Sequence, residues 1–209
     1  MTIQLPSLAY AYGALEPFID GVTMEIHHRG YHAAYVDRLR QLLADQEALR
    51  RMSLEEILSD IRVVPEEIRQ EIRNNAGGHL NHSLFWHELS PDGGEPRGAI
   101  VDAIGASFGD LATFQKAFAR AAMSRFGSGW AWLCMNSVAR LEILSLPNQD
   151  SPIMLGYRPV LGLDLWEHAY FLKYHNRRHD YIAAWWHAID WANVNEVYQH
   201  YLEMVSRAP

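Results

Sequence analysis

The sequence Asp164-Leu165-Trp166-Glu167-His168 offers a carboxylate and an imidazole four residues apart. Residues 160–164 are mostly apolar and predict a short strand that ends at Asp164, and a helix is predicted from about Trp166. Asp164 and His168 would therefore converge at a strand-to-helix corner. Two histidines far upstream, His27 and His82, lie in predicted helices and could complete the group from another part of the chain.

Together these four side chains supply three nitrogens and one carboxylate oxygen. That mixture suits a transition metal, whereas calcium and magnesium prefer shells of oxygen ligands. A metal that takes five or six partners would keep an open position for solvent or a small substrate. Because no acid/base pair lies nearby, the set favours redox chemistry at a metal. Any one of these histidines alone is more often structural, and the joint occurrence with flanking aromatics carries the prediction.

Composition narrows the classes of partner. The 209 residues are 49% hydrophobic, which is ample for a core, and the formal net charge of −7 with no basic run argues against nucleic acid. No apolar stretch reaches the length of a membrane span, so no membrane partner is expected. Cys134 is the single cysteine and excludes an internal disulfide. The N-terminal residues show no export signal, and a cytoplasmic location is therefore expected.

The first ninety residues are predicted to be helical. An amphipathic stretch opens at Glu16-Pro17 and runs to about Leu43, Ser53 starts a short helix with a capping box, and a long helix runs from Pro65 to about Leu89. The apolar positions of the first stretch are Ile19, Val22, Ile26, Ala33, Val36, Leu39 and Leu43. The Gly77-Gly78 pair inside the long helix suggests a close approach by a neighbouring backbone or by metal-bound solvent.

The loop at residues 91–96 is the best boundary between two lobes, 1–90 and 91–209. Beyond it we expect helices at 97–107 and 110–125, a hairpin of strands at 129–135 and 140–146, and a third strand at 160–164. Further helices should begin near Trp166, Asp180 and Asn193. The predicted fold class is α+β, with an N-terminal helical hairpin lobe, a C-terminal lobe of helices around a three-stranded antiparallel sheet, and the metal site between them.

Five blocks of sequence, in order, give the chain a resemblance to the iron/manganese superoxide dismutases from Leu5 to about Tyr198. They are Met24-Glu25-Ile26-His27-His28, Asn81-His82-Ser83-Leu84-Phe85-Trp86, Gly127-Ser128-Gly129-Trp130-Ala131-Trp132, Pro147-Asn148-Gln149-Asp150 and Asp164-Leu165-Trp166-Glu167-His168. The resemblance implies disproportionation of superoxide to oxygen and hydrogen peroxide at one redox-cycling ion. It implies His27, His82, Asp164 and His168 as the metal ligands.

The resemblance also implies roles around the metal. Gln149 should contact metal-bound solvent, and Tyr35 should hydrogen-bond to Gln149 at the mouth of the substrate channel. Glu167 should reach His168 of a partner subunit, which predicts a homodimer or a homotetramer. The other residues implied near the site are His32, Gly78, Trp86, Trp130, Trp166 and Arg178, with the tryptophans as its wall and Arg178 as a cation that attracts the anionic substrate. Gly78 together with Gln149 is typical of the manganese type, so manganese is the expected cofactor, with iron possible.

Two positions depart from the family pattern. Tyr31 stands where the family usually has a histidine, and Phe171 stands where it usually has a tyrosine. The usual hydrogen bond between the two across the dimer interface cannot form, because Phe171 has no hydroxyl. We expect Tyr31 and Phe171 still to pack as aromatics, with the outer proton relay weakened or routed through water.

Three alternative functions stay open at this point. Glu25 and His28 have the spacing of a di-iron carboxylate bundle, but a second such motif is not apparent. A zinc hydrolase would need a general base, and none is obvious in the sequence. A protein of the same fold could also hold or sense a metal without turnover.

Overall fold

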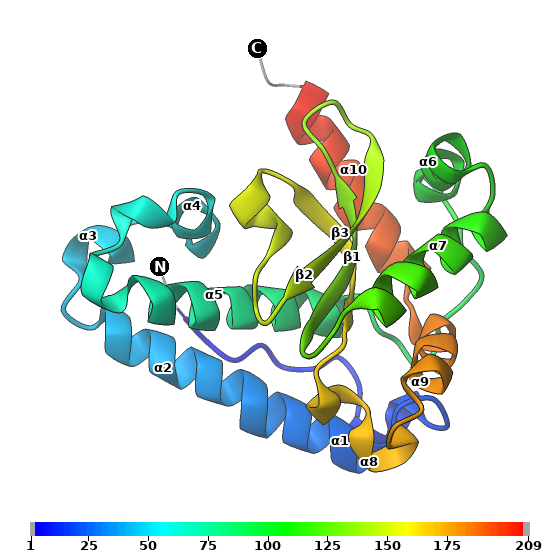
Figure 1. The fold of residues 1–209 in the computed structure, drawn as a ribbon, viewed down its shortest axis with the longest axis horizontal. Helices are drawn as coiled ribbons and strands as arrows, with labels where there is room; N and C mark the ends of the chain where they lie inside the picture. Colours follow the sequence, from blue (N-terminus) through cyan, green and yellow to red (C-terminus); the bar gives the residue numbers. More distant parts are fainter. Residues whose placement is uncertain (1–2, 207–209) are drawn as a thin grey trace.

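The computed structural model describes residues 3–206, as helices around one small antiparallel sheet (Figure 1). The strands are β1 Gly129–Met135, β2 Leu141–Pro147 and β3 Arg158–Asp164. The α-helices are α1 Gly21–Glu25, α2 Ala33–Leu43, α3 Glu47–Arg50, α4 Leu54–Ser59, α5 Glu66–His87, α6 Ala99–Phe108, α7 Leu111–Ser124, α8 Phe171–Tyr174, α9 Arg178–Trp185 and α10 Trp191–Ser206. The predicted α+β class, with a helical N-terminal part and a three-stranded sheet after it, is confirmed.

A helical rod followed by a second long helix dominates the first half. The rod consists of α1, a π-helical segment (Ile26–His32) and α2, and it packs against the antiparallel α5 (Figure 1). The prediction that the rod begins at Glu16-Pro17 is wrong, because it begins at Gly21. The Asp20 side chain caps it by accepting a hydrogen bond from the Thr23 backbone N–H at 2.9 Å.

The predicted apolar face of the rod is partly wrong, and the π-helical segment is the reason. Val22 and Ile26 were assigned to that face, yet they are 61% and 44% exposed. A wider turn shifts the side chains that follow it relative to a regular 3.6-residue period. The inward positions are taken instead by Thr23, Met24, His27, His28 and His32. The histidines of this segment are therefore directed into the molecule by the helix geometry itself.

The sheet has the strand order β2-β1-β3, with both pairs antiparallel. The central strand β1 is buried along its whole length, as its run of aromatic and aliphatic residues requires. Its register sets Trp130 opposite Asp164 at the end of β3. The predicted hairpin of β1 and β2 is confirmed, and Cys134 is buried within β1 as a small apolar residue.

The last third begins its helices at slightly different points from those predicted. After Asp164 the chain forms a single 3₁₀ turn at Glu167–Ala169, and α8 begins only at Phe171. The cause is a bend in which the Trp166 backbone N–H donates to Asp164 Oδ1 at 2.8 Å. Near the C-terminus, α10 begins at Trp191, where Asp190 accepts from the Asn193 backbone N–H. No helix within residues 3–206 is long and apolar enough to cross a membrane.

One charged group of the core has no charged partner in the described part of the chain. Glu88, just beyond α5, is 1% exposed, and its Oε2 accepts from the Gly162 backbone N–H at 2.9 Å. Its other oxygen has no hydrogen-bond partner there. Burial raises the pKa of Glu88 well above its ordinary value, only partly offset by the Gly162 hydrogen bond.

We expect Glu88→Gln to be more stable than the unmodified protein at pH 8, with a smaller advantage at pH 5. The folded pKa is raised, so the folded state holds a proton that the unfolded state loses as the pH rises above about 4.3. The stability of the unmodified protein therefore falls with pH relative to that of the amide variant. Urea unfolding of both proteins at the two pH values measures this difference, and a constant difference would contradict it.

Candidate metal centre

Four side chains from four separate parts of the fold meet at one point. His27 comes from the π-helical segment, His82 from α5, Asp164 from the end of β3, and His168 from the 3₁₀ turn that follows. One nitrogen or oxygen atom of each lies within 4.8 Å of the corresponding atoms of the other three. All four predicted ligands are thus brought together, and within residues 3–206 this is the group of side chains suited to hold a metal ion.

The carboxylate of Asp164 is oriented by its own loop. Its Oδ1 accepts from the Trp166 backbone N–H, which leaves Oδ2 directed at the histidines. The distances from Oδ2 to Nε2 are 3.1 Å for His27, 3.2 Å for His168 and 3.5 Å for His82. Asp164 is fully buried, so this oxygen faces imidazole nitrogens rather than water.

Hydrogen bonding indicates which nitrogen of His82 carries the proton. Its Nδ1 lies 2.6 Å from the backbone oxygen of Gly78, and a carbonyl can only accept. Nδ1 is therefore the donor, and Nε2 of the neutral ring presents a lone pair to the Asp164 carboxylate. Although they lie near that carboxylate, Nε2 of His82 and Nε2 of His27 make no hydrogen bond within the described residues.

The electrostatics keep the His27 and His82 rings neutral and the Asp164 carboxylate charged. Burial lowers the pKa of His27 to about 4, reinforced by the nearby His168. Burial also lowers the pKa of His82 well below its ordinary value. Burial alone would raise the pKa of Asp164, but the neighbouring His168 and His27 lower it below its ordinary range. Lone pairs and an anionic oxygen thus face one another in a dry site, an arrangement that a cation would stabilise.

This donor set fits a transition metal. Imidazole nitrogens and one carboxylate oxygen are ligands that manganese, iron and zinc accept, and Nε2 of His27 and Nε2 of His82 have no hydrogen-bond partner within residues 3–206. His82 also has the backbone acceptor on its second nitrogen that metal-bound histidines typically have.

Gln149 and Tyr35 are joined beside the four side chains, as predicted. Gln149 Nε2 donates to the Tyr35 hydroxyl oxygen at 3.1 Å, and Gln149 Oε1 accepts from Trp130 Nε1 at 3.0 Å. Burial, followed by the charge of Asp164, raises the pKa of Tyr35 to about 12. The Tyr35 hydroxyl therefore stays protonated at neutral pH, and within residues 3–206 its own hydrogen has no acceptor.

The predicted close approach at the glycine pair is confirmed. A Cβ added at Gly77 would lie 2.0 Å from the backbone oxygen of Gln149, and one added at Gly78 would lie 2.8 Å from the Tyr35 ring. Both distances are shorter than a carbon atom allows. No side chain fits at Gly78 unless Tyr35 moves, and the amide beside the four side chains comes from Gln149.

We expect Gly77→Ala to destabilise the folded protein by roughly 1–3 kcal/mol or more, because the new methyl group must displace the backbone that carries Gln149. Activity should fall as well, since the amide would move with that backbone. Chemical unfolding and activity of the metal-loaded variant measure both effects. Gly105→Ala is the matched control, because a Cβ at that helical glycine meets no atom within 4 Å. Equal stability of the two variants would contradict the prediction.

Aromatic rings surround the four side chains. Trp86 packs edge-on to His27 with ring centroids 4.8 Å apart, Trp130 lies edge-on to His82 at 5.3 Å, and Trp166 is nearly parallel to His168 at 5.6 Å. Trp86 is held by a hydrogen bond from its Nε1 to His32 Nδ1 at 2.9 Å. Because His32 Nδ1 accepts, its Nε2 carries the proton and donates to His79 Nδ1 at 2.7 Å.

Of the outer residues predicted near the site, Tyr31 contacts His168, whereas Phe171 and Arg178 have other partners. Tyr31 stacks directly on the His168 ring, and Glu167 is exposed. The Phe171 ring contacts His175, and no ring contact joins it to Tyr31 within the described chain. Their predicted packing concerns two subunits, so one chain does not test it. Arg178 donates to the Tyr170 hydroxyl and to backbone oxygens of Arg125, Gly127 and Leu165; these partners are neutral and leave its charge in place.

Two supports of Gln149 were not predicted. Asn81 Nδ2 donates to the Gln149 backbone oxygen at 3.2 Å, and Arg73 forms a two-point ion pair with Asp150 at 2.8 Å. The position of Asn81 next to His82 could have suggested its role. No signal connects Arg73 with Asp150 across 77 positions, because the pair exists only after α5 and the 147–151 turn have packed together.

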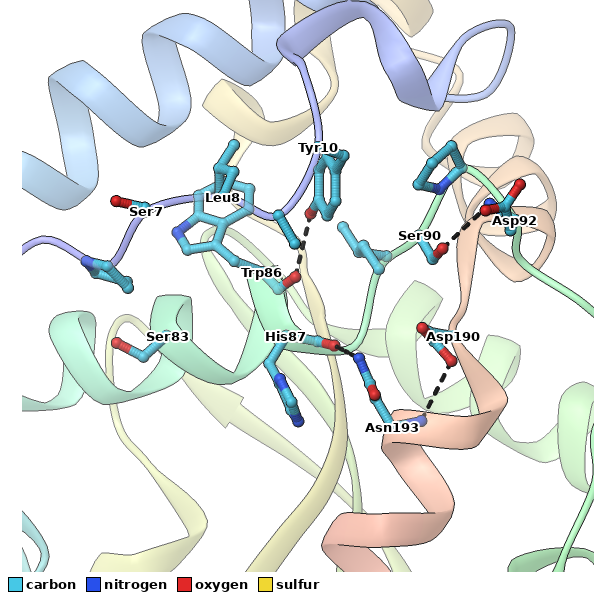
Figure 2. Close-up of a pocket in the computed structure, with 14 residues that line it drawn as sticks. Ser7, Leu8, Tyr10, Ser83, Trp86, His87, Ser90, Asp92, Asp190 and Asn193 are labelled. Carbon is cyan, nitrogen blue, oxygen red and sulfur yellow. Dashed lines mark hydrogen bonds between the residues drawn. The ribbon is translucent and has the colours of Figure 1, made fainter.

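A separate hollow lies behind Trp86 (Figure 2). It has a volume of about 480 Å³ and lies between the N-terminal segment, the end of α5 and the start of α10. Tyr10 closes one side through a hydrogen bond from its hydroxyl to the Trp86 backbone oxygen, and Asn193 closes another by donating to His87 O (Figure 2). None of the four converging side chains lines this hollow, so it is distinct from the metal centre.

Comparisons with known proteins agree with this geometry. Residues 2–90 match the profile of iron/manganese superoxide dismutases, alpha-hairpin domain, and residues 96–197 match that of iron/manganese superoxide dismutases, C-terminal domain. Superoxide dismutase (Mn) 3 from Leptolyngbya boryana is 52% identical over 197 residues, which cover 94% of this chain and 82% of that protein. On the fold, the converging donors and these matches, the chain belongs to the iron/manganese superoxide dismutase family.

Proposed function

We propose that this superoxide dismutase works at a single manganese ion held by His27, His82, Asp164 and His168. The observation that carries this proposal is the convergence of three imidazoles on one oxygen of a buried carboxylate. The reaction converts two superoxide ions and two protons to oxygen and hydrogen peroxide. When bound, the metal supplies the one-electron exchange that this reaction needs. The side chains of the protein hold the ligand geometry, exclude water and deliver protons.

We propose that Gln149 and Tyr35 control the delivery of protons and the approach of superoxide. The Tyr35 hydroxyl has a raised pKa and a hydrogen without an acceptor in the described chain, so it can donate a hydrogen bond to an incoming anion. The Gln149 amide uses one N–H on Tyr35 and has a second for solvent at the metal. Trp86, Trp130 and Trp166 exclude bulk water around them. We propose further that Arg178, whose hydrogen-bond partners are neutral, attracts the anion with its positive charge.

Manganese is proposed over iron, which stays possible. The relative from Leptolyngbya boryana is a manganese enzyme by name. Gly78 leaves no room for a side chain, and the amide of the site comes from Gln149, which is the arrangement we associated with manganese.

We propose that the protein is at least a homodimer formed by the face that covers His168. Phe126 is fully exposed and Phe171 is 47% exposed. Arg178 connects their segments, because it donates to the backbone oxygens of Arg125 and Gly127 on either side of Phe126, to the Leu165 backbone oxygen and to the hydroxyl of Tyr170, the neighbour of Phe171. Exposed apolar groups of this kind mark interfaces. Glu167, exposed on the same turn as His168, would reach the partner subunit. A sedimentation experiment that finds a fully active monomer would contradict this. We also propose that the chain divides into lobes 1–90 and 91–209 and that the protein is cytoplasmic.

The function is tested on purified protein loaded separately with manganese and with iron. Elemental analysis gives the metal bound per chain, and the decay of a superoxide pulse gives the activity. We expect one ion per chain and superoxide removal by the manganese form. Tight metal binding without superoxide removal would instead support a protein that stores or senses metal.

A further inference from the structure

His168 is held differently from the other histidines of the metal centre. His27 and His82 lie within long helical segments, whereas His168 belongs to a 3₁₀ turn of three residues. His82 is also fixed by its bond to the Gly78 backbone. Within residues 3–206, the hydrogen bond of His168 is to the Asp164 carboxylate, which belongs to the same group of donors. His168 therefore lacks, in one chain, the outer acceptor that usually orients such a ring.

Within one chain, two aromatic rings constrain this imidazole, and the proposed contact with Glu167 of a partner subunit would add to them. The Tyr31 and His168 rings have centroids 4.0 Å apart and planes inclined by 22°, and Trp166 lies at 5.6 Å and 23°. Tyr31 is the closer of the two and is 42% exposed, so it forms the outer cover of the imidazole. It comes from the same π-helical segment as His27, which links it rigidly to a second donor.

We propose that Tyr31 is a positioning residue for His168: the stacked ring, rather than its hydroxyl, holds the imidazole plane in the orientation that the metal requires. The inference rests on the proposed metal site. A ring that lies face to face at van der Waals distance blocks tilting of the imidazole, which a flexible aliphatic side chain does not. Because Tyr31 and His27 share one helical segment, release of His168 from the metal requires displacement of a ring anchored beside another donor.

The experiment compares Tyr31→Phe, which keeps the ring, with Tyr31→Leu, which removes it. Both are loaded with manganese and transferred to excess chelator at a temperature at which the unmodified protein releases metal slowly. We expect Tyr31→Phe to release manganese at nearly the unmodified rate and Tyr31→Leu to release it about tenfold faster. The electron paramagnetic resonance spectrum of bound manganese(II), which reports ligand geometry, should change only in Tyr31→Leu.

Phe18→Leu is the matched control, because it removes an aromatic ring that stacks on a histidine outside the metal centre, His187, with ring centroids 4.8 Å apart. It should release manganese like the unmodified protein. Unmodified release and spectrum in Tyr31→Leu would overturn the proposal, and so would equal acceleration in both Tyr31 variants, which would assign the effect to the hydroxyl. Absence of bound manganese in the unmodified protein would instead refute the metal site itself, so the two failures are distinguishable.

Discussion

Asp164→Asn should lose its metal and, with it, its activity. The amide keeps the size of the side chain but removes the negative charge that faces three imidazole nitrogens. Its oxygen can still accept from the Trp166 N–H, and its NH₂ would then be directed at the histidine lone pairs. Changes outside the ligands of a metal typically cost 10–100-fold in affinity or activity, so removal of the anionic ligand should weaken metal binding more than about a hundredfold.

Elemental analysis after dialysis measures the retained metal, and superoxide decay measures the activity. Asp37→Asn is a suitable control, since it makes the same chemical change on an exposed part of α2. The control should retain full metal content and activity. A fully metallated and active Asp164→Asn would show that this carboxylate is not a ligand.

Gln149→Leu should separate activity from metal content. Leucine fills nearly the same volume, but it breaks the hydrogen bonds with Tyr35 and Trp130 and leaves the Trp130 N–H unpaired in a buried position. No predicted ligand is changed, so the protein should still bind metal. Activity should fall by about 10- to 100-fold, because the amide that orients the Tyr35 hydroxyl is gone.

Trp130→Phe provides a graded test of the same network. It removes the hydrogen bond from Trp130 Nε1 to Gln149 Oε1 while the amide stays, so activity should fall less than in Gln149→Leu. Gln70→Leu, an exposed change near the start of α5, should have no effect on activity. Loss of metal in Gln149→Leu, or unchanged activity with metal bound, would contradict the proposed role of the amide.

The fold class and the four converging donors could be predicted from the sequence. They depend on residues that are close together in the chain, or on motifs that occur in a fixed order. Period-two alternation predicted β2, and the aromatic run predicted the buried β1. The glycine pair predicted the close approach that places Gln149 beside Tyr35. Asp164 and His168 could be paired from their four-residue spacing, because a strand end and the following turn necessarily lie together.

The remaining features depend on tertiary structure. The π-helical segment alters the period of the first helix, so Val22 and Ile26 were wrongly assigned to the buried face. The Arg73–Asp150 ion pair and the hydrogen bond from Gly162 to Glu88 join positions more than 70 residues apart. The stacking of Tyr31 on His168 depends on how two segments that are far apart in the sequence pack together, and no pattern in either segment predicts it.

The most direct measurement is a crystal structure of the manganese-loaded protein, with anomalous scattering recorded on both sides of the manganese absorption edge. We predict one anomalous peak per chain, bound by His27, His82, Asp164 and His168. A manganese peak at another position, or these four side chains directed away from one another with no ion between them, would contradict the account.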